Sequence, residues 1–407
     1  MAGLKFDERP ILVFWESTKA CLLACRHCRA EAMATPLPGQ LSTDEATTFI
    51  DSLVTFGRPY PVLIFTGGDV MMRPDLFPLA EHAKSLGIPI GMAPSVTPRL
   101  TVDARQKMRD VGVKTVSISL DGASAVTHDR VRGILGHFDQ TVSTLRDLVD
   151  DGFDVQVNTV VMAENVAELP TVAELLVGIG VKIWEVFFLI QVGRGRGSES
   201  VTELPPRSTE DVCHFLYDAS KYGMVVRTVE APFFRRVVMA RKAAEEDAGD
   251  TNRDTANACS DLRKDATGIE DPSQSNAFSS NPPSSPHDTG ALYRLLAEDL
   301  ALRLGPARSP SRAQTSGTRD GKGIVFVSHD GTVYPAGFLV VPLGNIRETP
   351  LSTIYRENPL LQQIRSSAFS GRCGMCEYQD LCGGSRSRAY AHTGDALATD
   401  PACLYPA

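Results

Sequence analysis

The sequence has no apolar run near the ~20 residues that a membrane-spanning helix needs. The apolar run close to its start, Ile11–Trp15, is also too short for the core of a signal peptide. Lys and Arg are not clustered, and the net charge of -8 gives no electrostatic footprint for nucleic acid. We therefore expect a cytoplasmic protein with neither a membrane nor a nucleic-acid partner.

The chain has 407 residues, of which 43% are hydrophobic and 22% charged, a composition typical of a globular protein with roughly two or three domains. It contains nine cysteines. In a reducing compartment, clustered cysteines bind metals or take part in chemistry more often than they form disulfides.

Short β-branched or aromatic runs alternate with segments of helical period from Ile11 to about Val229. A capping box, Ser42 with Glu45, predicts the start of the first helix. This repeated alternation indicates parallel strands with helical crossovers, and so an α/β fold in an open or partly closed barrel. Strands are expected at 11–16, 62–66, 88–92, 115–120, 155–161 and 182–189, and helices at about 43–56, 75–86, 101–110, 138–150 and 164–178.

The composition changes after residue 242. Residues 243–321 are rich in Ser, Asp, Asn, Pro and Ala, which favours a disordered linker or insertion, although 292–304 has helical apolar spacing. Two strand runs around Asp330-Gly331 then predict a hairpin, and a short helix is expected at about 351–366.

Three cysteines, Cys21, Cys25 and Cys28, follow the first expected strand directly. Thiolates so close together usually share one centre, and three of them can hold three corners of an iron–sulfur cube while the fourth iron stays open. Zinc is the alternative, but the loop has no fourth ligand, because His27 is too tightly tied between Cys25 and Cys28 to complete a tetrahedron.

Polar residues mark the ends of later strands. Gly67-Gly68-Asp69 ends the second strand, where paired glycines allow a ligand to approach the backbone, although such pairs are most often only turns. At the end of the fourth strand, alternation points three polar side chains to one side, where they can bind a ligand or satisfy strand-end hydrogen bonds. These three are Ser117, Ser119 and Asp121; Asn158 in the fifth strand is a similar candidate and Arg132 a weaker one.

Four cysteines in the tail, Cys373, Cys376, Cys382 and Cys403, can complete a centre without an open site. A closed 4Fe-4S cluster and a structural zinc both use four thiolates, so the metal is left open. Of the other two cysteines, Cys213 lies on a helical pattern and is expected to fill the core, and Cys259 is given no role.

The Cys-x3-Cys-x2-Cys triplet resembles the signature of the radical S-adenosylmethionine (SAM) superfamily. The resemblance covers residues 10–230 and implies a partial (βα)6 barrel in which the triplet binds a 4Fe-4S cluster whose open iron chelates SAM. It implies that His27 flanks the adenine and that Gly67, Gly68 and Asp69 correspond to a Gly-Gly-Glu-Pro loop that holds the SAM amino group. Asp69 and Val70 depart from that loop. Ser119, Asp121 and Asn158 are expected to contact SAM.

The tail resembles the C-terminal auxiliary-cluster (SPASM-type) domain of radical SAM maturases, and most closely those that modify haem precursors. This implies a second 4Fe-4S cluster on Cys373, Cys376, Cys382 and Cys403. The predicted division is a radical SAM barrel at 10–230, a disordered linker or insertion at 243–321 and an auxiliary iron–sulfur domain at 322–407.

The resemblance implies reductive cleavage of SAM to a 5′-deoxyadenosyl radical, which abstracts hydrogen from an unreactive carbon, with flavodoxin or ferredoxin as external electron donor. One candidate substrate is a tetrapyrrole that loses propionate carboxyls, with Arg386 and Arg388 as carboxylate partners. Another is a small ribosomal peptide. Arg194 and Arg196, in a glycine loop after the sixth strand, could also meet carboxylates, although a solvated loop is the simpler reading. The alternative to an enzyme is a non-catalytic metal-binding protein, either a scaffold or an electron carrier.

Overall fold

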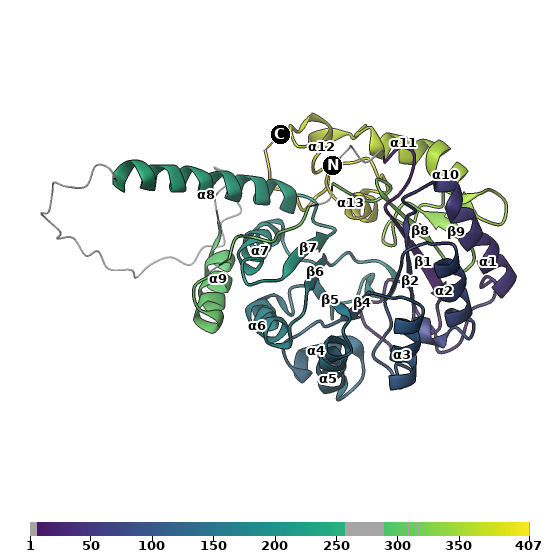
Figure 1. The fold of residues 1–407 in the computed structure, drawn as a ribbon. Helices are drawn as coiled ribbons and strands as arrows, with labels where there is room; N and C mark the ends of the chain where they lie inside the picture. The colour runs from purple at the N-terminus through teal and green to yellow at the C-terminus, as the bar shows by residue number, and fades with distance from the viewer. Residues whose placement is uncertain (1–5, 257–288, 308, 316, 407) are drawn as a thin grey trace, which may run out of the picture.

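The computed structural model describes residues 6–256, 289–307, 309–315 and 317–406. Across these ranges one curved sheet is surrounded by helices, as Figure 1 shows. The strands are β1 (Leu12–Thr18), β2 (Val62–Gly67), β3 (Ile90–Met92), β4 (Thr115–Ser119), β5 (Asp154–Val161), β6 (Ile183–Phe188), β7 (Val225–Val229), β8 (Ile324–Val327), β9 (Thr332–Tyr334) and β10 (Gly344–Asn345). The helices are α1 (Thr43–Ser52), α2 (Leu76–Ser85), α3 (Val102–Asp110), α4 (Ala125–Arg132), α5 (His137–Asp150), α6 (Leu169–Ile179), α7 (Pro206–Ala219), α8 (Phe234–Ala256), α9 (Ala291–Leu304), α10 (Leu351–Glu357), α11 (Pro359–Arg365), α12 (Gly371–Met375) and α13 (Arg386–Thr393).

Strands β1 to β7 lie side by side in chain order, and each pairs in parallel with the next. Parallel neighbours need crossover connections, which the intervening helices provide. The predicted α/β class, the six strands and the five helices between them are confirmed, and the capping box of Ser42 and Glu45 starts α1. The expected strands and helices did not include β7 or α4, and of α7 the sequence showed only the helical pattern around Cys213.

The tail continues the same sheet. β8 pairs in parallel with β1, and β9 turns back antiparallel to β8, so the predicted hairpin is confirmed. The helix expected at 351–366 is two helices, α10 and α11, which meet at Asn358. Asn358 precedes Pro359 and has extended backbone (ψ 125), because a residue before proline is disfavoured in the helical conformation.

Part of the range 243–321, which was expected to be a disordered linker or insertion, is ordered, and the helical spacing at 292–304 is confirmed as α9. Helix α9 packs against α6 and α7, and its Leu296 and Leu300 are buried in the main core. Residues 257–288, with Cys259, lie outside the described ranges. Helix α8 extends away from the barrel in Figure 1. In the described part of the chain, no helix has both the length and the apolar character to cross a membrane.

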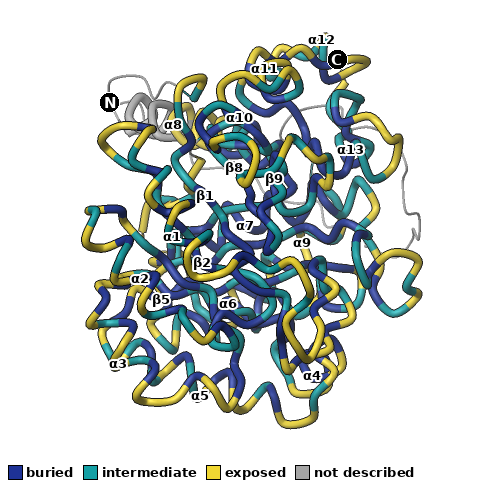
Figure 2. The backbone as a smooth tube through the Cα atoms, turned by 90° about the vertical axis from the view of Figure 1, so that its right-hand side faces the viewer, coloured by how far each residue is buried: buried dark blue, intermediate teal, exposed yellow. Residues whose placement is uncertain are grey.

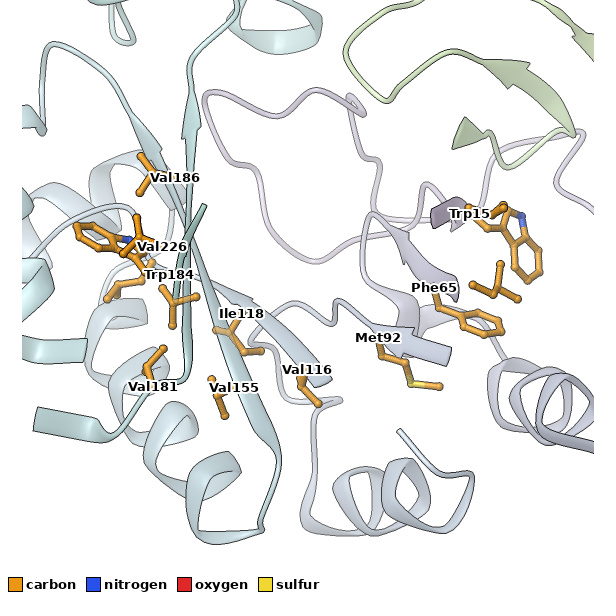
Figure 3. Packing of buried hydrophobic residues seen from close by; sticks show 14 of the residues in the cluster. Trp15, Phe65, Met92, Val116, Ile118, Val155, Val181, Trp184, Val186 and Val226 are labelled. Atoms are coloured by element: carbon orange, nitrogen blue, oxygen red, sulfur yellow. The ribbon is translucent and has the colours of Figure 1, made fainter. Parts of the chain in front are cut away.

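Side chains alternate between two environments along the strands. One set, including Trp15, Phe65 and Trp184, packs between the sheet and the helices and forms the core shown in Figure 3. In Figure 2 the buried parts of the backbone, drawn dark blue, gather in the middle of the molecule. The other set points to the inside of the barrel, where Phe14 and Glu185 line a cavity. Because the side-chain period of a strand is two, the core and the cavity are built by neighbouring residues of the same strands.

Candidate active site

The cysteine loop directly follows β1, at the carboxyl end of the parallel strands. Buried and exposed residues alternate along 21–26. Cys21 and Cys25 are buried, whereas Leu22, Ala24 and Arg26 are exposed to solvent. Cys21, Cys25 and Cys28 all line a cavity of about 650 Å³, and their thiols are free. The loop therefore presents three sulfur atoms to the interior and a thin outer layer to solvent.

Hydrogen-bond donors point at these sulfur atoms. The Leu23 N–H donates to Cys21 Sγ at 3.4 Å, and Arg132 Nη1 lies 3.6 Å from Cys25 Sγ. Burial raises the pKa of the Cys21 and Cys25 thiols. Burial also opposes ionisation of Cys28, but hydrogen bonds from the Ala32 backbone and from Arg194 hold its pKa below the usual value. Three thiols with N–H donors fit the ligands of an iron–sulfur cluster, whose sulfur atoms accept such bonds.

The glycine pair packs tightly against the chain that leads into the cysteine loop. A Cβ on Gly67 would lie 2.2 Å from the Thr18 carbonyl oxygen, and one on Gly68 would lie 2.4 Å from that of Ala20. Gly67 also has a φ of 143°, which side chains rarely adopt. Any larger residue would push the two loops apart, so both positions need glycine.

Asp69 is fully buried and does not line the cavity with Gly67 and Gly68. Its carboxylate accepts hydrogen bonds from Thr97 Oγ1 at 2.7 Å and from the Ser95 N–H at 3.3 Å. Burial raises its pKa. In this structure Asp69 therefore ties the glycine loop to the segment after β3.

A buried charge network joins residues that are far apart in sequence. Asp121 Oδ2 lies 2.6 Å from Arg132 Nη2 and 3.1 Å from His27 Nε2. Burial opposes the charge of Asp121, but the Arg132 guanidinium and His27 hold its pKa well below the usual range. Since Arg132 also reaches Cys25, this network fixes the cysteine loop against the end of β4, and His27 remains at the cavity wall.

Polar side chains from β4, β5 and β6 line the inside of the barrel. Ser119 and Asn158 are among them, as predicted. Two more had not been predicted: Gln156, whose Nε2 donates to Asn158 Oδ1 at 2.8 Å and to Glu185 Oε2 at 2.9 Å, and Glu185 itself. Burial raises the pKa of Glu185. The available signals were that Glu185 is the one charged residue in the apolar strand β6 and that Gln156 lies two positions before Asn158 in β5.

Another part of the cavity lining is aromatic and basic. Arg29 lies over the Phe326 ring at 4.6 Å and pairs with Glu16 at 3.3 Å. Phe338 lies near both Arg29 and Phe187. Arg227, on β7, also lines the cavity, and its Nε donates to Gln314 Oε1 at 2.6 Å. This wall offers flat apolar surface beside guanidinium groups.

Arg386 and Arg388 do not line the cavity, so the expectation that they bind substrate carboxylates is wrong. Arg386 is fully buried and donates to the carbonyls of Ala396 and Ala398 at 3.1 and 2.7 Å. Arg388 donates to the Glu230 carbonyl at 2.8 Å. Arg386 therefore joins parts of the tail to one another, and Arg388 joins the tail to the residue after β7.

The tail cysteines receive a similar set of donors. The N–H groups of Asp400, Tyr378 and Gly384 each lie 3.4 Å from a cysteine sulfur. Burial raises the pKa of Cys382 to about 11 and that of Cys403 to about 12. Across the described ranges, no three His, Cys, Asp or Glu side chains converge enough to hold a single metal ion. The N–H donors to the tail cysteine sulfur atoms also fit an iron–sulfur cluster.

Cys213, the cysteine on α7, is a fully buried core residue, as expected.

Two arginines connect the cavity wall to the tail. Arg235 and Arg319 both line the cavity. Arg235 Nη1 donates to the Leu381 carbonyl at 2.8 Å, and Arg319 Nη1 donates to that of Gln379 at 3.0 Å. The loop that carries Cys382 therefore lies directly behind this wall.

Comparison with known families gives two matches. Residues 15–176 match the radical SAM superfamily, and residues 319–377 match the iron-sulfur cluster-binding domain called SPASM. The first match covers the strands and loops that build the cavity from β1 to α6, and the second includes Cys373 and Cys376.

Proteins of known function are similar over almost the whole chain. An "AdoMet-dependent heme synthase" of Nitratidesulfovibrio vulgaris is 34% identical, with 97% of this chain and 92% of the relative covered. A protein of the same name from Methanosarcina barkeri is 33% identical, with coverage of 99% and 98%. Among solved structures, Streptococcus suis SuiB bound to S-adenosylmethionine superposes with a TM-score of 0.63 at 11% identity, covering 98% of this chain and 78% of SuiB. At that identity the superposition shows the shared fold alone.

Proposed function

This chain belongs to the radical SAM superfamily, and we propose that it removes propionate carboxyl groups from an iron-containing tetrapyrrole. It is an enzyme that binds SAM, a 4Fe-4S cluster and an auxiliary iron–sulfur cluster. The observation that carries the substrate proposal is the cavity, whose lining combines the three cysteines of the loop with aromatic rings and the guanidinium groups of Arg29 and Arg227. The names of the heme synthases that it resembles support the same substrate class.

We assign the cluster that binds SAM to Cys21, Cys25 and Cys28, and the auxiliary cluster to the four tail cysteines. When bound, the first cluster and SAM supply a 5′-deoxyadenosyl radical, and the auxiliary cluster supplies a one-electron acceptor. The backbone of Gly67 and Gly68 is proposed to bind the amino group of SAM, and His27, Ser119 and Asn158 its nucleoside. Asp69 and Asp121 are proposed to position the site without touching SAM. The carboxylate of Asp69 accepts from Thr97 and that of Asp121 pairs with Arg132, and each holds a loop of the site in place.

The flat aromatic surface of Phe326 and Phe338 suits a porphyrin ring, because aromatic faces stack on extended π systems. Arg29 and Arg227 are proposed to bind propionate carboxylates, since guanidinium groups match carboxylates in two-point hydrogen bonds. Loss of one hydrogen atom from the CH2 next to the ring, one electron and CO2 converts R-CH2-CH2-COO⁻ into R-CH=CH2. The walls exclude water, which protects such a reactive intermediate.

The electron that leaves the substrate needs an acceptor near the cavity. Arg235 and Arg319 hold the loop of Cys382 behind the cavity wall, and this supports a relay role for the tail. An external protein such as flavodoxin or ferredoxin is proposed to supply the electron that starts SAM cleavage. We also propose the three-part division into 10–230, 243–321 and 322–407, and a cytoplasmic location, which suits the free thiols.

The test is anaerobic turnover of the reconstituted enzyme with SAM, dithionite and Fe-coproporphyrin III, a propionate-bearing iron porphyrin. We expect 5′-deoxyadenosine and a porphyrin in which a propionate has become a vinyl group, both seen by mass spectrometry. SAM cleavage that leaves every porphyrin unchanged would overturn the substrate proposal and favour a peptide. A protein that binds zinc, or iron without any SAM cleavage, would instead support the non-catalytic scaffold.

A further inference from the structure

The outer side of the cysteine loop carries a surface that the reaction in the cavity does not use. It consists of Leu22, Arg26, Arg130, Leu135 and Arg196, all exposed, and we call it the arginine face. Leu135 is 92% exposed and Leu22 46%, so both apolar side chains are open to contact by a partner. We propose that this face docks an acidic electron-carrier protein, which delivers the electron to the cluster held by Cys21, Cys25 and Cys28.

The face is continuous because three segments meet at the cysteine loop. The Arg26 N–H donates to the Val131 carbonyl at 2.9 Å, which brings Arg130 next to the loop. The Arg194 N–H donates to the Cys28 carbonyl at 3.1 Å, which brings Arg196 to the same place. A Cβ on Gly133 would lie 3.3 Å from the Ala24 carbonyl oxygen, so the segment before Leu135 also contacts the loop.

The charge of the face is opposite to that of the chain. The protein as a whole has a net charge of -8, yet each of the three segments exposes an arginine here. In the ranges that the structure describes, no carboxylate lies within ion-pair distance of the three guanidinium groups. Asp129 is buried, and its carboxylate accepts from the N–H groups of Gly136 and Phe138 at 2.6 and 2.7 Å. Glu31 is the one exposed carboxylate in the cysteine segment 19–33. Such a surface attracts an acidic partner.

The arginine face also lies on the solvent side of the loop that carries Cys21 and Cys25. Exposed and buried residues alternate along 21–26, so a single layer of side chains separates solvent from the buried thiols. The substrate and SAM occupy the opposite, inner side in the proposed function. A partner on the arginine face can therefore transfer one electron, from its own reduced flavin or iron–sulfur group to the cluster, while the cavity is filled. No atom or proton moves in this step.

The experiment compares two ways of reducing the same holoenzyme. SAM cleavage to 5′-deoxyadenosine is measured with dithionite, and then with flavodoxin kept reduced by its reductase and NADPH. The test variant is Arg130→Glu with Arg196→Glu. The matched control is Lys114→Glu with Arg146→Glu, which makes the same change in charge at exposed positions, with Lys114 before β4 at the other end of the strands.

We expect the test variant to lose about tenfold or more of the flavodoxin-driven rate at low salt, while its dithionite-driven rate stays within about twofold of the parent. The difference should shrink at about 1 M salt, where the screening length falls to about 3 Å. The control should match the parent in both assays. Equal flavodoxin-driven rates in the test variant and the parent, or an equal loss in the control, would overturn the proposal.

If the charge reversals also lower the dithionite-driven rate, a milder double variant, Arg130→Gln with Arg196→Gln, removes the two charges without reversing them and tests the docking assignment. It must lose flavodoxin-driven cleavage selectively, and a loss that is equal with both reductants overturns the docking assignment. Because SAM cleavage is the readout, the result does not depend on whether the substrate is a tetrapyrrole.

Discussion

The two groups of cysteines use the same chemistry in different surroundings. In both, N–H groups donate to cysteine sulfur atoms at 3.4 Å, as at Cys21 and Cys382. The first three cysteines line the cavity, and none of the four tail cysteines does. The ligands alone therefore do not decide what a centre does. In the proposed function, access to the cavity allows the first centre to bind SAM, whereas the tail centre, whose cysteines do not line the cavity, accepts an electron.

The sharpest test of this difference is the loss of one ligand from the first group. Cys25→Ala should abolish 5′-deoxyadenosine formation, because an incomplete cluster cannot present SAM to the cavity. Iron content should fall by about half, since the tail cluster remains. Chromatography of the reaction with dithionite measures the product, and iron analysis is the control. Normal cleavage in this variant would show that Cys25 is not a ligand.

The matching change in the tail is Cys376→Ala. It should leave SAM cleavage in place, because no tail cysteine faces the cavity, but abolish formation of the vinyl product. Both compounds are quantified in one reaction by mass spectrometry. Porphyrin turnover at the parent rate would remove the relay role from the tail, and so the functional contrast between the two centres.

The buried network beside the first group gives a smaller effect, on stability. Arg132→Gln leaves Asp121 buried without its guanidinium partner, and a broken buried ion pair costs about 3–5 kcal/mol. Chemical denaturation of the protein without clusters measures the free energy of unfolding. Arg105→Gln, which breaks the partly exposed pairs to Asp147 and Asp151, is the control and should cost about 1 kcal/mol or less. Equal costs would mean that the Asp121 network is as well solvated as a surface pair.

The smallest expected effect concerns Arg227, which lies on β7 and lines the cavity. Arg227→Gln should raise the KM for the porphyrin about tenfold, since one charge-assisted hydrogen bond contributes about 1.5–3 kcal/mol. SAM cleavage without porphyrin should be unchanged. Steady-state kinetics measures the effect, with Arg388→Gln as comparison because Arg388 does not line the cavity. An unchanged KM would show that Arg227 does not bind a carboxylate.

Local patterns predicted much of this fold. The alternation of strand and helix gave the class, and the Asp330-Gly331 turn gave the hairpin, because hydrophobic period and turn chemistry act between near neighbours. The helical spacing at 292–304 also predicted α9, but not its place in the core, because Leu296 and Leu300 pack where α9 meets α6 and α7, far away in sequence. The patterns also could not show that β8 pairs with β1 and so closes one side of the cavity.

For the site, the sequence by itself predicted which cysteines are cluster ligands, and the fold brings the first three of them to one cavity. Cysteine spacing is a local property, and it singled out Cys21, Cys25 and Cys28 together with the tail group. Tertiary structure decided which other side chains reach the site. Arg29, Arg227 and Glu185 line the cavity, whereas Arg386 binds carbonyls inside the tail and Arg388 binds the carbonyl of Glu230 after β7. An arginine looks the same in sequence in either place, because its role depends on which carbonyls, rings and carboxylates the folded chain brings within reach.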